Sequence, residues 1–162
     1  MNFHSKKTKA KGVVLIEVIV AVSIVTLTVF ALILSVQKAL SLSGHALHQS
    51  RASFLMQEGV NALYIVRDTG WSTIDGLSLS TDYYLEFIGG TWTATSSLQT
   101  IGKYTRTFQI SNVNRNILTD DIASIGLDDS NTKKVDLSVS WSEGGEAYNE
   151  EMSFYLINSF SS

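Results

Sequence analysis

The residue with the clearest chemical problem in this sequence is Glu17. It is the only charged residue in the apolar run from Val13 to Val36. An ionised carboxylate costs on the order of 2.5–3.5 kcal/mol at the centre of a membrane helix and less near its end, so Glu17 needs a cationic partner or a proton. The alternative is an interfacial acid that reaches the lipid headgroups.

Two histidines form a second candidate site. His45 and His48 are three residues apart, which places them on one face of a helix, a spacing that can bind a metal ion. No acid or cysteine nearby completes a ligand set. We therefore expect a pair of exposed histidines.

A run of acids between the later strands could supply oxygen ligands. It contains Asp120, Asp121, Asp128 and Asp129. Their spacing is not that of a calcium-binding loop. We expect solvated loop acids, and neither a metal nor any other cofactor.

The sequence offers no candidate for catalysis. It has no serine in a glycine elbow, no phosphate-binding glycine loop after a strand and no HExxH helix. The chain also has no cysteine, which excludes disulfides and thiolate metal sites. We therefore expect that the protein is not an enzyme.

The elements that position Glu17 begin with a membrane span. As a helix, Val13–Val36 would be about 36 Å long, enough to cross a hydrocarbon core of about 30 Å. The basic residues before Gly12 keep the N-terminus cytoplasmic, and they are Lys6, Lys7, Lys9 and Lys11. Beyond Val36 the chain has a net charge of −6, which argues against a head that binds nucleic acid.

The rest of the chain predicts an exported head. Gln37–Asp68 is amphipathic and should extend the helix, which should end at Thr69–Thr73 before a loop over Ile74–Thr81. Alternating apolar residues or flanking turn residues predict strands at Tyr83–Ile88, Thr91–Thr95, Lys103–Ser111, Val135–Trp141 and Tyr148–Ile157. Gly89-Gly90 and Gly144-Gly145 are expected turns, and Asn112–Thr132 is an expected polar connection. In the strand from Lys103 to Ser111, Arg106 intrudes on the apolar face. The predicted fold is α+β, with a long N-terminal helix packed on an antiparallel sheet of about four strands.

The segment Lys11-Gly12-Val13-Val14-Leu15-Ile16-Glu17-Val18 resembles the cleavage and methylation signal of type IV prepilins and pseudopilins. Gly12, Leu15, Ile16 and Glu17 match that signal, whereas Val13 stands in place of phenylalanine and Val14 in place of threonine or serine. The resemblance implies cleavage between Gly12 and Val13, N-methylation of Val13, and a role for Glu17 in assembly. In that role, the ammonium group that the cut creates on Val13 of an adjacent subunit would pair with Glu17. Gln57-Glu58-Gly59 with Arg67-Asp68 is similar to a pattern of minor-pilin-like proteins, although Glu58 and Arg67 are equally read as solvated helix residues.

The resemblance also implies an organisation and a function. Residues 1–12 would be the leader, 13–36 the transmembrane half of the helix, 37–68 its amphipathic half and 69–162 the head. The chain would be a structural subunit, of the minor type, of a type IV pilus or of a type II secretion or DNA-uptake pseudopilus. Its partners would be a prepilin peptidase, other pilin subunits, the assembly platform and the membrane.

The implied location is the inner membrane, with the head outside, followed by an extracellular or periplasmic filament. The alternative is an uncleaved single-span protein that displays a small adhesin-like binding domain, and it predicts an intact leader.

Overall fold

The computed structural model describes residues 9–159, and side chains from residue 13 onward. Lys6 and Lys7 of the predicted leader, as well as the side chains of Lys9 and Lys11, lie outside the described part. The chain divides into two compact units between Ala46 and Leu47, and each is considered by itself below.

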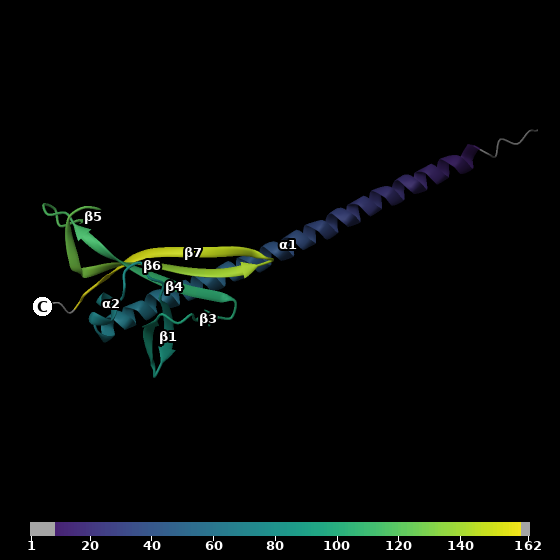
Figure 1. Cartoon of the computed structure of the whole chain (residues 1–162). Helices are drawn as coiled ribbons and strands as arrows, with labels where there is room; N and C mark the ends of the chain where they lie inside the picture. Colours follow the sequence, from purple (N-terminus) through teal and green to yellow (C-terminus); the bar gives the residue numbers. More distant parts are fainter. Residues whose placement is uncertain (1–8, 160–162) are drawn as a thin grey trace, which may run out of the picture. The chain divides into compact units, whose positions relative to one another are not determined.

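A single helix, α1 (Lys9–Thr69, 61 residues), accounts for the described part of the first unit and continues into the second (Figure 1). From Val13 to Val36 its large apolar side chains are 49–70% exposed. The hydroxyls of Ser23, Thr26 and Thr28 donate to the carbonyls of Ile19, Val22 and Val25 in the preceding turn. These polar groups are therefore satisfied within the helix, as a lipid environment requires.

In the second unit, α1 becomes one-sided. Its buried residues recur every three or four positions and are Ala52, Leu55, Met56, Ala62, Leu63 and Val66. The helix ends at Thr69, within one residue of the predicted end. The expected loop that follows contains a short helix, α2 (Ser72–Asp75), because Ile74 is fully buried and anchors a helical turn there.

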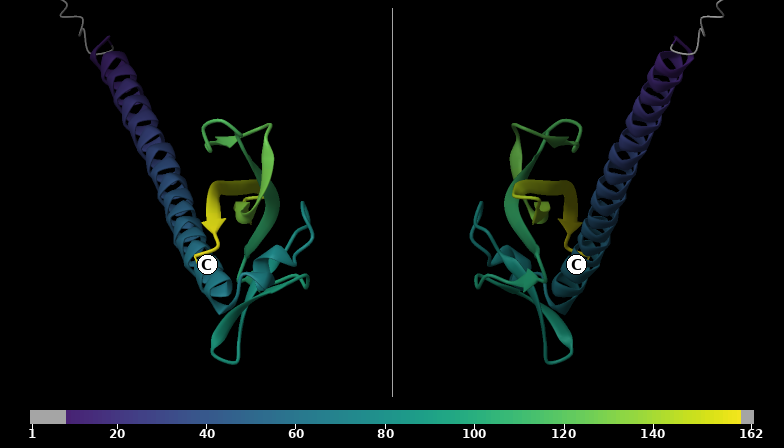
Figure 2. Two further views of the ribbon diagram at one scale, coloured as in Figure 1. Left: turned by 90° about the vertical axis from the view of Figure 1, so that its left-hand side faces the viewer. Right: turned by 90° about the vertical axis from the view of Figure 1, so that its right-hand side faces the viewer.

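The main sheet of the second unit is antiparallel and has the order β3-β4-β6-β7, with β5 paired to the far end of β4. Its strands are β3 (Thr100–Ile101), β4 (Tyr104–Arg115), β5 (Ile122–Ala123), β6 (Leu127–Glu143) and β7 (Glu146–Ile157). The last part of α1 lies along one face of this sheet (Figure 2) and shares one core with Phe108, Leu137 and Leu156. The predicted α+β fold is confirmed.

The two strands β1 (Tyr84–Ile88) and β2 (Thr91–Thr95) form a separate hairpin. Its turn is Gly89-Gly90, with φ angles of 62° and 85°, as the glycine pair predicts. One bridge, Tyr83 to Phe108, connects the residue before β1 to β4.

The prediction for Asn112–Thr132 is partly wrong. β4 runs on to Arg115, β6 already begins at Leu127, and Ile122 and Ala123 form β5. The cause is pairing between distant residues: Arg115 is opposite Ile122 on one side and opposite Leu127 on the other. The residues of this stretch that lie outside strands are 116–121 and 124–126.

Candidate functional site

The predicted processing and assembly residues lie on the first turns of α1. Val13 is 65% exposed and Glu17 is also exposed. Because they are four residues apart, they lie on the same face of the helix, about 6 Å apart along its axis. Within residues 13–159, no ion pair or hydrogen bond of this chain occupies the Glu17 carboxylate.

The surface around Glu17 is apolar on every side of the helix. Val13–Thr69 contains a window long and apolar enough to cross a membrane, and none of that window is buried. The chain therefore presents a helix that could cross a membrane and that carries one acid, Glu17.

The second unit contains a buried cation, Arg106, which the sequence places on an apolar strand face without indicating its partners. Arg106 on β4 is 2% exposed, and its Nη1 donates to the carbonyl oxygen of Leu55 (2.9 Å) and to the Glu58 carboxylate (2.8 Å). Its guanidinium carbon lies 5.3 Å from the centre of the Trp92 ring. Glu58 is thus the counter-ion of a buried arginine, while its own side chain remains 50% exposed to solvent.

Close packing surrounds Arg106 where it meets α1. A Cβ atom on Gly59 would lie 2.9 Å from Cδ of Arg106 and 3.0 Å from Cδ2 of Leu137. The signal in the sequence was an arginine on an apolar strand face together with Glu58-Gly59 on the helix. Only the fold shows that these residues meet.

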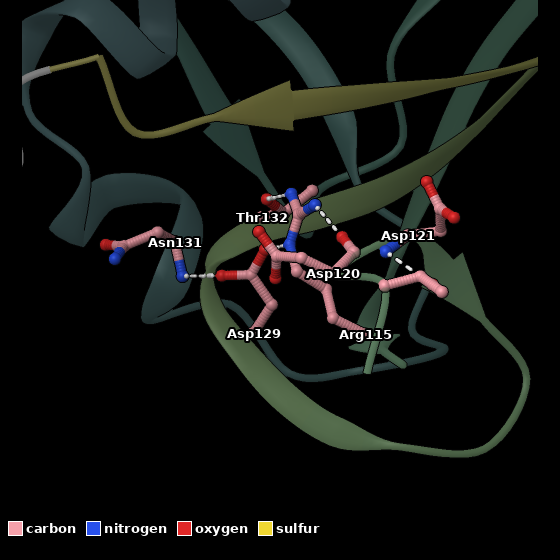
Figure 3. Close-up of polar contacts among 7 residues, drawn as sticks. Arg115, Asp120, Asp121, Asp129, Asn131 and Thr132 are labelled. Carbon is pink, nitrogen blue, oxygen red and sulfur yellow. Dashed lines mark hydrogen bonds and ion pairs between the residues drawn. The ribbon is translucent and has the colours of Figure 1, made fainter. Parts of the chain in front are cut away.

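An arginine, Arg115, lies among the predicted loop acids. Asp129 accepts a hydrogen bond of 2.6 Å from Nε of Arg115, and the backbone oxygen of Asp120 accepts one of 2.8 Å from Nη1 (Figure 3). Within the part of the chain that the structure describes, no group of three or more His, Cys, Asp or Glu residues could hold a metal ion. Here an arginine supplies the positive charge among these acids.

Hydrogen bonds fix the protonation of Asp129. Its bond with Thr132 lowers the pKa of the carboxyl below its usual value, and the bonds from Arg115 and from the Asn131 backbone lower it further against the opposing effect of burial. The bond to Asp129 in turn raises the pKa of Arg115. The pair is therefore fully charged at neutral pH and fastens β4 to the start of β6.

The histidine prediction is also corrected in part. His48 is half-buried, with Nδ1 3.0 Å from the Tyr104 hydroxyl and Nε2 4.0 Å from Oε1 of Glu143. These contacts join α1 to β4 and to the end of β6. His48 thus contributes to packing of the helix on the sheet.

No protein-family model, no curated protein and no solved structure matches this chain.

Proposed function

We propose that this chain is a structural, pilin-like subunit that is cut after Gly12 and assembles into a filament through α1. The observation that carries the proposal is Glu17, a single acid among exposed apolar side chains, one helical turn after Val13. Cleavage would place a cation at Val13 and so remove the cost of the charge in a subunit packed alongside. The subunit would be of the minor type, of a pilus or of a secretion or DNA-uptake pseudopilus.

The head supports this proposal through its architecture. Residues 47–69 of α1 bury one stripe against the sheet and leave Leu47, Phe54 and Ile65 exposed at 68%, 74% and 43%. The same helix therefore packs one stripe of residues into the core of its own head and leaves other apolar residues exposed for contact with a neighbouring subunit. A structural role needs no catalytic residue, and it uses the helix as the assembling element.

The decisive experiment is the mass of the mature chain. The full-length protein is expressed in cells with an active prepilin peptidase, extracted from membranes and examined by intact-mass and N-terminal analysis. We expect a chain that begins at Val13, with or without one methyl group. The matched control is Gly12→Leu, which should keep the leader because the cut requires a small residue there.

A wild-type chain that still begins at Met1 in those cells would remove the proposal. It would leave a single-span membrane protein that displays its head as a binding domain. Normal cutting of the Gly12→Leu control would show that another protease is responsible, and it would equally contradict processing at the predicted signal.

A further inference from the structure

The loop between β4 and β6 presents a group of aliphatic side chains to solvent. We call this group the aliphatic loop; its members are Ile117, Leu118, Ile122, Ile125 and Leu127, exposed at 72%, 93%, 45%, 86% and 63%. Single exposed aliphatic residues are ordinary, but these five follow closely on one another in the sequence, and strand pairing places Ile122 and Leu127 on either side of Arg115, so together they are a candidate interaction surface. None of these residues is used by the core of the head.

The aliphatic loop is held in shape by its own polar contacts. The backbone N–H of Asn116 donates to the Asp121 oxygen (2.8 Å), and that of Asp120 donates back to the Asn116 oxygen (2.9 Å). Arg115 then binds the Asp120 oxygen from the strand side (Figure 3). Because these bonds fix the backbone, a partner would not have to order the loop, which lowers the entropic cost of binding.

The position of the aliphatic loop in the head restricts its partner. β6 begins near the end of α1, where Trp71 Nε1 donates to the Ser130 oxygen (3.1 Å) and Lys133 pairs with Asp75 (2.9 Å). The acids Asp120, Asp121 and Asp128 disfavour anionic lipid as the partner, because like charges repel.

A complementary surface lies on α1 of the same head. We call it the helix hollow; it is a shallow depression of about 370 Å³ lined by Arg51, Phe54, Leu55 and Glu58. Phe54 is 74% exposed there and Leu55 is 8% exposed, so both an accessible and a buried apolar side chain line it. The Glu58 carboxylate is bound to Arg106, so Arg51 supplies the positive charge that suits the acids beside the loop.

We propose that the aliphatic loop of one copy of this chain docks in the helix hollow of the next copy. This proposal rests on the filament function proposed above and names one contact between heads. Because the two surfaces differ and lie on the same chain, the contact is heterologous: it joins one copy to the next in a single direction and does not close a dimer, so even a few copies of a minor subunit can be adjacent in a filament. Leu118 would be the central residue, with Asp120 and Asp128 toward Arg51.

The absence of native cysteine makes this contact directly testable. Full-length Leu118→Cys and Phe54→Cys chains are co-expressed with the assembly machinery, and sheared filaments are treated with a short bismaleimide. We expect a covalent dimer from the mixed filaments and none from filaments of either variant alone. The matched control is Leu98→Cys with Phe54→Cys, because Leu98 is an exposed leucine (64%) outside the loop.

A second measurement uses Leu118→Asp, whose 93% exposure should leave the urea midpoint of the head unchanged. We expect incorporation into filaments to fall at least tenfold, with Leu98→Asp close to wild type. Filaments that form without the Leu118–Phe54 dimer, or that tolerate Leu118→Asp, would overturn this proposal and leave the filament function standing. A dimer with a different protein at Leu118 would also overturn it. An uncut chain that forms no filaments would instead remove the function itself, and this inference with it.

Discussion

Nη1 of Arg106 lies 2.8 Å from Oε2 of Glu58, and this contact joins the middle of β4 to α1. The arginine side chain is 2% exposed, whereas the glutamate side chain is 50% exposed. Within residues 13–159, Nε and Nη2 of Arg106 have no hydrogen-bond partner. The two members of this pair are therefore unequal, because removal of the acid leaves a buried charge and removal of the arginine leaves an acid that water can solvate.

The first prediction follows from that inequality. Glu58→Ala should destabilise the head by about 2–3 kcal/mol, because it leaves the buried guanidinium of Arg106 without a counter-ion. Arg106→Met should cost less, since a side chain of similar length fills the space and the unmatched N–H groups disappear. The measurement is urea unfolding of the full chain in detergent, followed by tryptophan fluorescence, since all three tryptophans lie beyond Gly70. A larger cost for Arg106→Met would contradict the argument.

The second prediction concerns the glycine beside this pair. Gly59→Ala would gain about 1 kcal/mol of helix propensity, but its Cβ would meet Cδ of Arg106 at 2.9 Å. Because the guanidinium is anchored, we expect overpacking to cost about 1–3 kcal/mol and the net effect to be destabilising. The control is Asn61→Ala, an exposed position on the same helix that should gain stability. Stabilisation by Gly59→Ala in the same urea assay would show that the arginine moves freely.

The elements that could be predicted are those whose signal lies within a short stretch of sequence. The alternation of Val135, Leu137, Val139 and Trp141 against polar neighbours predicted the central strand, and each of these four is buried. The one-sided spacing on α1 predicted its length, and the glycine pairs predicted both hairpin turns. Local periodicity is sufficient here because each element buries one face.

The features that could not be predicted are contacts between residues that are far apart in the sequence. In the sequence, Arg106 is a charged residue on an otherwise apolar strand face. The fold shows that Glu58 and Trp92 lie beside it. The stretch after Ser111 is polar in composition and was therefore predicted as a connection. Its ordered structure comes from the hydrogen bond of Arg115 to Asp129 and from the strand pairing of Arg115 with Leu127. Of the candidate site, Glu17 and the apolar helix that could cross a membrane were predicted from the sequence. The aliphatic loop was not, because the sequence around it is that of a polar connection.

The third prediction is a loss of stability in acid. The pKa of Asp129 is lowered in the folded chain, chiefly by its hydrogen bond with Thr132, so its contribution is complete above the unfolded value of about 3.9. It is lost as the pH falls from there through the lower folded value. Asp129→Asn should cost about 1 kcal/mol at pH 7 and should flatten the decline below pH 4. Urea midpoints between pH 2.5 and pH 7 test this, and an unchanged acid decline in the variant would contradict it.

The last prediction separates the role of Glu17 from that of the span. Glu17→Ala makes the helix more apolar, so membrane insertion and cleavage after Gly12 should be retained. Incorporation into filaments should fall at least tenfold, since the ammonium of Val13 on a neighbouring chain loses its partner. Ser23→Ala is the matched control, because the Ser23 hydroxyl already donates to the Ile19 oxygen (2.7 Å) and needs no partner outside its own helix. Quantitative immunoblotting of sheared filaments against membrane-bound subunit gives the ratio for each variant. Equal ratios for Glu17→Ala and Ser23→Ala would mean that the carboxylate is neutral or solvated in the membrane and does not set the packing of the subunits.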